Sequence, residues 1–295
     1  MPNIRPQTGR STRNLPNQTG KRLCLNRSTT YQTPDPRVLA NALDLASDRL
    51  LSAREALDQV ECAAVARVVD ELVGEDTAAF LELRARRFLG VETTGIYRTT
   101  AGDARHLEGH QPALAELAAL VGRLDDYDRG GWEPLCTYRG PRDIQDAVCD
   151  LDLAAARTLP HSGDIFRARE RARRRLSEET AQAERLYCCT IAVAIEMQLT
   201  EYGVLPEFDA ASVELEMRPS GEMQPTGVYR TAAGEVRQLT EKAIEGATEH
   251  ILTEEGRAGW EPLCTRHLTE GGTMVYHLDL VAASALPPIA DTVPA

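Results

Sequence analysis

The stretches GGWEPLCTYR (residues 130–139) and AGWEPLCTRH (residues 258–267) share the core Gly-Trp-Glu-Pro-Leu-Cys-Thr, which holds both tryptophans of the chain. Two other pairs keep the same order: TGIYRTTAGDARHL (94–107) with TGVYRTAAGEVRQL (226–239), and LDLAAARTLP (151–160) with LDLVAASALP (278–287). The offset between copies is about 127 to 132 residues, far longer than the repeats of solenoid proteins. We therefore predict a tandem duplication of a module of about 127 residues, arranged with pseudo-twofold symmetry.

The repeat sets the expected domain boundaries. Residues 1–33 are predicted to form a disordered basic arm, because they are rich in Asn, Thr, Pro and Arg. The first module is expected over 34–160 and the second over 161–287, with a C-terminal tail over 288–295.

Hydrophobic periodicity predicts the same elements in each module. Apolar residues recur every three or four positions over 36–73, which predicts a long amphipathic helix. Its counterpart over 165–202 is polar on nearly every face until Leu186, so its first half is expected to project or to bridge the two modules. A strand, a hairpin at Ala-Gly-Asp or Ala-Gly-Glu and a short helix should follow. WEPLCTYR (132–139) and AVCDLDLAAA (147–156) are expected to be the last two strands, so each module is predicted to be α+β with an antiparallel sheet.

Composition and net charge limit the classes of function that this chain can have. The 295 residues carry a formal net charge of -12, and the arm holds six basic and no acidic side chains, so the rest carries -18. An acidic body repels nucleic acid as a whole. The chain shows no apolar run of membrane-spanning length and no secretory leader, and its seven cysteines lack disulfide-framework spacing. We expect a cytoplasmic protein with reduced thiols and no membrane association.

The repeated aromatic and arginine residues are the first candidates for a binding site or an interface between modules. Large aromatics dominate core energetics, so a core role for the tryptophans is favoured over ligand binding. Arginine and tyrosine on a sheet can clamp an anion or stack on a base, although cross-strand ion pairs explain them as well. The candidates are Tyr97, Arg98, Arg105, Trp132, Tyr229, Arg230, Arg237 and Trp260.

A metal site and a catalytic site receive less support. Cys264, His267 and His277 have ligand types that suit zinc, but the first module carries Cys136, Arg139 and Asp150 at those positions. No glycine-rich phosphate loop, nucleophile elbow or His-Glu-x-x-His motif is present, and a cysteine beside leucine in a strand is usually inert. We expect no cofactor and favour a non-enzymatic protein over an enzyme.

Basic residues supply a candidate polyanion contact. Six arginines fall within residues 167–175, but they cover nearly all faces of a helix and have glutamates beside them. The candidate contacts are Arg5, Arg10, Arg13, Lys21, Arg22 and Arg27 of the arm, with Arg167, Arg171 and Arg174.

Three functions are compatible with this sequence. The first is a non-enzymatic interaction or assembly protein whose basic arm docks on a partner protein or on a second copy. The second is a nucleic-acid-binding regulator that uses the arm and Arg167–Arg175. The third is a small-molecule enzyme or sensor with a site between the modules.

Overall fold

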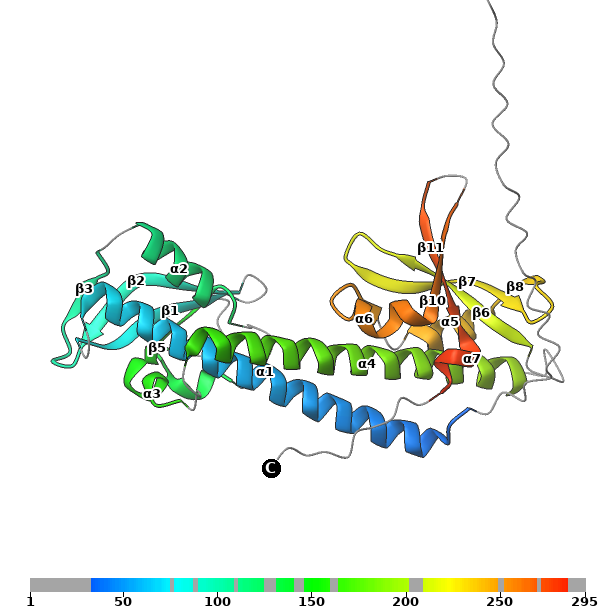
Figure 1. The fold of residues 1–295 in the computed structure, drawn as a ribbon, viewed down its shortest axis with the longest axis horizontal. Helices are drawn as coiled ribbons and strands as arrows, with labels where there is room; N and C mark the ends of the chain where they lie inside the picture. Colours follow the sequence, from blue (N-terminus) through cyan, green and yellow to red (C-terminus); the bar gives the residue numbers. More distant parts are fainter. Residues whose placement is uncertain are drawn as a thin grey trace, which may run out of the picture. The chain divides into compact units, whose positions relative to one another are not determined.

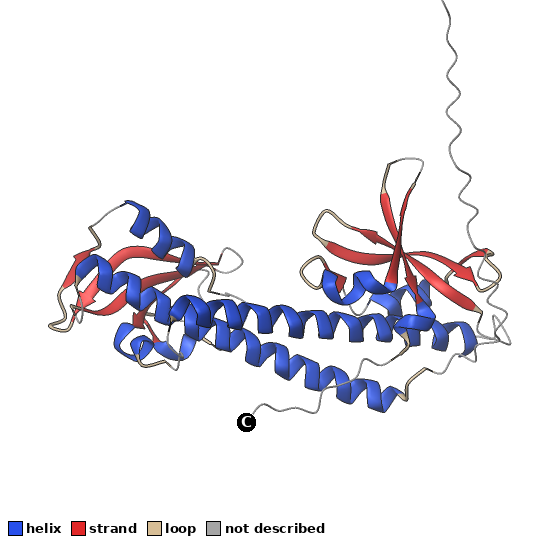
Figure 2. Cartoon of the chain, in the orientation of Figure 1, coloured by secondary structure: helices blue, strands red, loops and turns tan. Residues whose placement is uncertain are grey.

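The computed structural model describes residues 33–74, 77–86, 90–108, 111–124, 131–140, 146–159, 164–201, 209–248, 252–269 and 272–285. All of them belong to one compact unit that begins at Tyr31. The fold is mixed α and β, with two antiparallel sheets (Figures 1 and 2). No described helix has an apolar stretch long enough to cross a membrane.

Two long helices, α1 (Pro36–Val73) and α4 (Ile165–Glu201), confirm the two predicted long helical segments. The Asp35 side chain caps the start of α1 by accepting a hydrogen bond from the Arg37 amide at 2.8 Å, and Pro36 fits the first helical turn because its missing N–H would have no partner there. The chain leaves α1 at Gly74, whose φ of 93° favours glycine.

The first sheet has the strand order β3-β2-β1-β5-β4, with every neighbouring pair antiparallel. One face packs on the second half of α1 and on α2, and its core includes Val65, Leu83, Leu117 and Trp132. The elements are β1 (Ala78–Arg86), β2 (Gly90–Thr99), β3 (Ala104–His106), α2 (Gln111–Val121), a 3-10 turn η1 (Glu133–Leu135), β4 (Cys136–Tyr138), β5 (Asp146–Asp152) and α3 (Leu153–Arg157).

The second sheet has the order β10-β11-β6-β7-β8, with β9 also paired to β7. Its core joins the second half of α4 to residues such as Val213, Leu215, Trp260 and Leu278. The elements are β6 (Ala210–Met217), β7 (Glu222–Thr231), β8 (Val236–Gln238), α5 (Glu241–Thr248), β9 (Leu252–Thr253), α6 (Arg257–Trp260), η2 (Glu261–Leu263), β10 (Cys264–Leu268), β11 (Met274–Asp279) and α7 (Leu280–Ala283).

The helices α1 and α4 pack antiparallel. A third buried cluster joins Leu39, Ala42 and Ala46 from the first half of α1 to Leu186 and Val193 from the second half of α4. At the other end, Glu61 contacts arginines in the first half of α4. Each long helix therefore supplies the core of its own sheet with its second half and packs on the other helix with its first half.

Two predicted strands are wrong in part. Residues 132–139 begin as a 3-10 turn at Glu133, and only Cys136–Tyr138 form a strand. The strand predicted over 147–156 ends at Asp152, whose side chain accepts a hydrogen bond from the Ala155 amide at 2.9 Å and caps α3. Asp279 caps α7 in the same way, with the Ala282 amide at 3.0 Å. A capping carboxylate ends each strand one turn earlier than alternation alone indicates.

Candidate functional site

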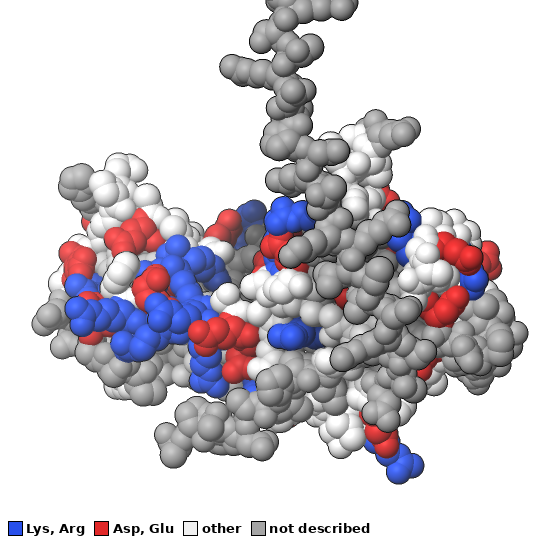
Figure 3. Space-filling view, turned by 45° about the vertical axis from the view of Figure 1, so that its right-hand side comes forward, with Lys and Arg blue, Asp and Glu red and all other residues white. Residues whose placement is uncertain are grey.

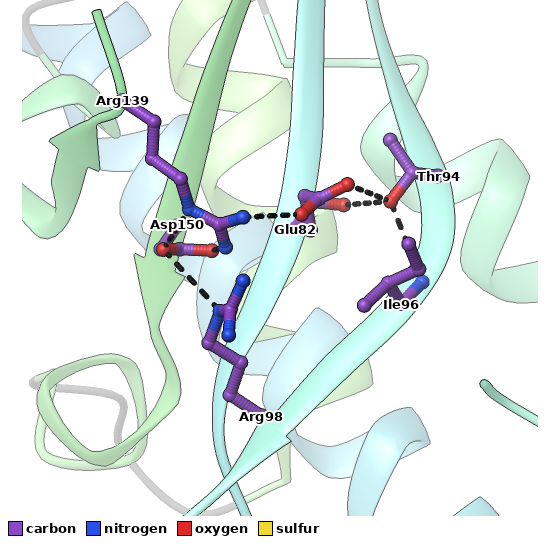
Figure 4. A network of polar contacts seen from close by, with 6 residues as sticks. All are labelled: Glu82, Thr94, Ile96, Arg98, Arg139 and Asp150. Atoms are coloured by element: carbon purple, nitrogen blue, oxygen red, sulfur yellow. Dashed lines mark hydrogen bonds and ion pairs between the residues drawn. The ribbon is translucent and has the colours of Figure 1, made fainter. Parts of the chain in front are cut away.

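A cluster of charged side chains lies on the face of the first sheet that does not pack on α1 and α2 (Figure 4). We call this side, and its counterpart on the second sheet, the open face. Glu82 of β1 and Asp150 of β5 are direct cross-strand partners, so their carboxylates point to the same side. Arg139 binds both: its Nη1 lies 2.7 Å from Glu82, and its Nε lies 2.6 Å from Asp150. Arg98 of β2 approaches Asp150 to 3.8 Å. We call Glu82, Thr94, Arg98, Arg139 and Asp150 the first polar cluster.

A threonine fixes the orientation of Glu82. The Thr94 hydroxyl donates to Glu82 Oε1 at 2.9 Å and accepts a bond from the Ile96 amide at 3.4 Å. The chain can turn back on this hydroxyl because Gly95 has a φ of 77°. Thr94 and Arg139 therefore both hold the Glu82 carboxylate. The hydrogen bond between Arg139 and Asp150 is the main cause of the raised pKa of Arg139.

A second cluster occupies the corresponding positions on the second sheet. Glu214 of β6 pairs across the strands with His277 of β11, as Glu82 pairs with Asp150. The Thr226 hydroxyl donates to Glu214 Oε1 at 3.0 Å. His267 of β10 packs edge-on against His277, with ring centroids 4.8 Å apart. We call Glu214, Thr226, Arg230, His267 and His277 the second polar cluster.

His277 is the most buried ionisable group of the second polar cluster. Its side chain is 7% exposed, and Nε2 lies 3.9 Å from Glu214. Burial lowers the pKa of His277, the positive charges of Arg230 and His267 lower it further, and Glu214 opposes them. Its Nδ1 is buried and has no hydrogen-bond partner among the described residues. The neutral imidazole is thus favoured.

The repeated aromatics lie in the two cores. Trp132 and Trp260 are both fully buried, and Tyr97 and Tyr229 are 6% and 2% exposed. The Trp260 indole donates to the Thr253 carbonyl at 2.8 Å, and its ring meets Tyr276 edge-on at 5.3 Å. Trp132 and Trp260 belong to separate core clusters, so the structure does not bring them together.

The glycine before each tryptophan allows a close approach to a long helix. A Cβ on Gly131 would lie 2.5 Å from the Asp58 Cβ, and one on Gly259 would lie 2.0 Å from the Ala181 carbonyl oxygen. Only hydrogen fits in that space, so glycine seats both tryptophan segments against α1 and α4.

The repeated arginines divide between the two sides of the sheets. Arg98 and Arg230 lie on the open faces, across from Phe80 and Ser212. Arg105 is the cross-strand partner of Tyr97 and lines a shallow hollow with Leu72 and His106. Arg237 binds Asp209 at 3.0 Å and Glu235 at 2.7 Å.

The proposed zinc ligands do not share a face. Cys264 packs against the second core, whereas His267 and His277 lie on the open side of the same two strands. Among the described residues, no group of three or more His, Cys, Asp or Glu side chains could hold a metal ion.

Five of the six described thiols have a raised pKa, which disfavours their reactive thiolate form. Burial raises the pKa of Cys189 to about 11, and burial together with Glu261 raises that of Cys264 to about 12. The pKa of Cys136 is also raised, first by a hydrogen bond with Cys149. Reactive cysteines need a lowered pKa, so these side chains behave as small apolar groups.

Sequence reasoning missed Glu61, which is 1% exposed in α1. Its carboxylate lies 3.0 Å from Arg169 and from Arg173 of α4 and 3.5 Å from Arg123. The available signal was a glutamate beside the apolar stripe of α1, together with an arginine excess in the first half of α4.

Of the predicted polyanion contacts in that helix, Arg167, Arg171 and Arg174 are exposed. Those of the arm lie outside the described residues.

No protein-family model matches the chain, and no curated protein or solved structure is significantly similar to it.

Proposed function

We propose that this is a non-enzymatic interaction and assembly protein, built from two duplicated α+β modules, whose basic arm docks on a second copy. Three features that occur in both halves support the duplication. The strand orders correspond, a threonine hydroxyl donates a hydrogen bond to a glutamate on each open face, and the glycine before each tryptophan lies close to a long helix. The raised pKa values of Cys189 and Cys264 disfavour these two thiols as nucleophiles.

The observation that carries the assembly role is the exposed apolar end of the β10–β11 hairpin. Leu268 and Met274 are cross-strand partners, and they are 67% and 40% exposed. β10 is the last strand of its sheet, and no described strand pairs with its outer side. An exposed edge strand with apolar side chains is a template for pairing with another chain. We propose that β10 of one copy pairs with β10 of another.

Charge complementarity supports the docking of the arm. Residues 1–33 carry +6 and the remaining chain carries -18, which follows from the total of -12. Opposite charges on two copies attract each other and accelerate encounter, while salt screens the attraction. The arm would therefore strengthen association most at low ionic strength.

Sedimentation velocity over a protein concentration series tests the proposal. The wild type should associate, and Leu268→Lys should weaken association at least about tenfold, which is about 1.4 kcal/mol. Val236→Lys is the matched control, because Val236 is 55% exposed in β8 at the opposite edge and should leave association unchanged. Deletion of residues 1–33 should remove the salt dependence. A wild type that stays monomeric at about 100 µM, far above the Kd of stable dimers, contradicts the proposal.

A polyanion-binding role is the second candidate. Figure 3 shows Lys and Arg side chains gathered into a continuous patch on one face. Arg167 of α4 has an 80% exposed side chain, and its only described ion pair, with Asp164, is long at 3.9 Å. Binding through phosphates must weaken steeply with salt. A mobility-shift assay with duplex DNA at about 50 mM salt should show binding that is lost near 200 mM, and no shift at the lower salt excludes this role.

The third hypothesis, a small-molecule enzyme or sensor with a site between the modules, stays a prediction.

A further inference from the structure

The charged side chains of the first polar cluster form ion pairs with one another. Two guanidinium groups, Arg98 and Arg139, face two carboxylates, Glu82 and Asp150. Every charged member has an opposite charge within 4 Å, and Arg139 contacts both carboxylates. An added anion would meet arginines that are already paired.

The second polar cluster differs at two positions. His277 stands where the first sheet has Asp150, since both are the cross-strand partner of a threonine-braced glutamate. His267 takes the place of Arg139 on the neighbouring edge strand. The aspartate that pairs with Arg98 therefore has no counterpart beside Arg230. No described carboxylate lies within ion-pair distance of Arg230, which is exposed on the open face.

We propose that the second polar cluster is a binding site for a small oxyanion, a carboxylate or a phosphate group, held by Arg230 and by the imidazole of His277. The guanidinium offers forked N–H donors that match such oxygens. The His277 Nδ1 is buried without a partner and can donate one further hydrogen bond when it carries a proton. His267 packs against His277 at the rim.

Glu214 would support the protonated form of His277. Its carboxylate lies 3.9 Å from Nε2 and is oriented by the Thr226 hydroxyl. When an anion binds, it adds a second negative charge beside the ring, so the imidazolium becomes favourable despite burial. Binding should therefore be tighter at pH 6 than at pH 8 and should be accompanied by proton uptake.

An anion fits this chemistry better than a metal cation. The guanidinium of Arg230 carries a permanent positive charge, and its influence already disfavours a second positive charge on His277. The described residues also provide no third ligand of the type that a zinc site requires.

The test is an NMR titration of the histidine side chains with inorganic phosphate and, separately, with acetate, in a buffer whose conjugate acid is a cation. His277 resonances should shift saturably with at least one anion at pH 6. The apparent pKa of His277 should rise by about one unit, which corresponds to tenfold tighter binding to the protonated form. The anion that saturates at the lower concentration identifies the ligand class.

Two variants make the result specific. Arg230→Gln should abolish the saturable shift, and Asp150→Asn should create anion binding on the first sheet by freeing Arg98, while Arg139 keeps its bond to Glu82. Arg230 lies on β7, which is not adjacent to β10, so association through the β10 edge should persist in Arg230→Gln. Failure of one proposal is thus distinguishable from failure of the other. No saturable shift at about 50 mM anion, well above the Kd expected of an arginine-containing site, or an equal shift in Arg230→Gln, overturns the inference.

Discussion

The buried carboxylate of Glu61 in α1 lies 3.0 Å from the Arg169 guanidinium of α4, 108 residues away along the chain. The two side chains are 1% and 13% exposed. Because α1 belongs to the first sheet's core and α4 to the second's, this ion pair ties the two halves of the fold together.

Replacing Glu61 should destabilise the fold strongly. Glu61→Gln leaves Arg169 without its buried counter-charge, and breaking such a pair typically costs about 3–5 kcal/mol. Since Arg123 and Arg173 are 42% and 38% exposed and can turn to water, we expect about 2–3 kcal/mol in urea unfolding. Glu71→Gln is the control: its pair with Arg67 is about 60% exposed and should contribute less than about 1 kcal/mol. Equal losses in both variants would contradict this role for Glu61.

The glycine before the second tryptophan should resist substitution for steric reasons. A Cβ in Gly259→Ala would lie 2.0 Å from the Ala181 carbonyl oxygen, so the segment must move off α4. Gly272→Ala provides the comparison, because that site has a φ of 80° but open space and should cost only about 1–2 kcal/mol. We expect the Gly259 variant to lose clearly more stability in thermal unfolding. The same ranking is expected for Gly131→Ala.

The stability of the protein should fall at acidic pH partly through His277. Its folded-state pKa is lowered below the ordinary value of 6.5, so the unfolded chain binds a proton first as pH falls. The stabilisation is fully present above pH 6.5 and is lost as pH decreases through the folded pKa. His277→Gln should therefore flatten the pH dependence of the free energy of unfolding below pH 6.5. Buffers free of phosphate and acetate are needed, and identical profiles for both proteins would contradict the assignment.

The described thiols should react slowly in the folded state. Burial and nearby groups raise the pKa of Cys62, Cys136, Cys188, Cys189 and Cys264. A Cys24→Ser variant removes the cysteine outside the described residues. With it, a chromogenic disulfide reagent at pH 8 should label almost nothing until guanidinium is added. Rapid labelling of Cys136 or Cys264 in the native protein would contradict this prediction and favour an enzyme with a cysteine nucleophile.

Local patterns predicted most elements correctly. The period of 3.6 placed α1 and α4, and the glycine at positive φ marked both hairpins at Gly102 and Gly234. The errors arose where a side chain competes with the pattern. Asp152 caps a helix and ends β5, and Pro134 lies in a 3-10 turn where a strand was predicted. Alternation cannot reveal a cap, because the deciding hydrogen bond depends on the backbone that follows.

The sequence by itself determined the two long helices, the paired hairpin motifs and the apolar face of each sheet, since these depend on spacings of two to four residues. Only the tertiary structure decided that Glu61 meets Arg169, that Gly259 touches α4, and that His277 stands where the first sheet has Asp150. The reason is distance along the chain. The first two contacts join residues 108 and 78 positions apart, and the third relationship compares two separate sheets. All three follow from strand register and helix packing, which no local pattern specifies.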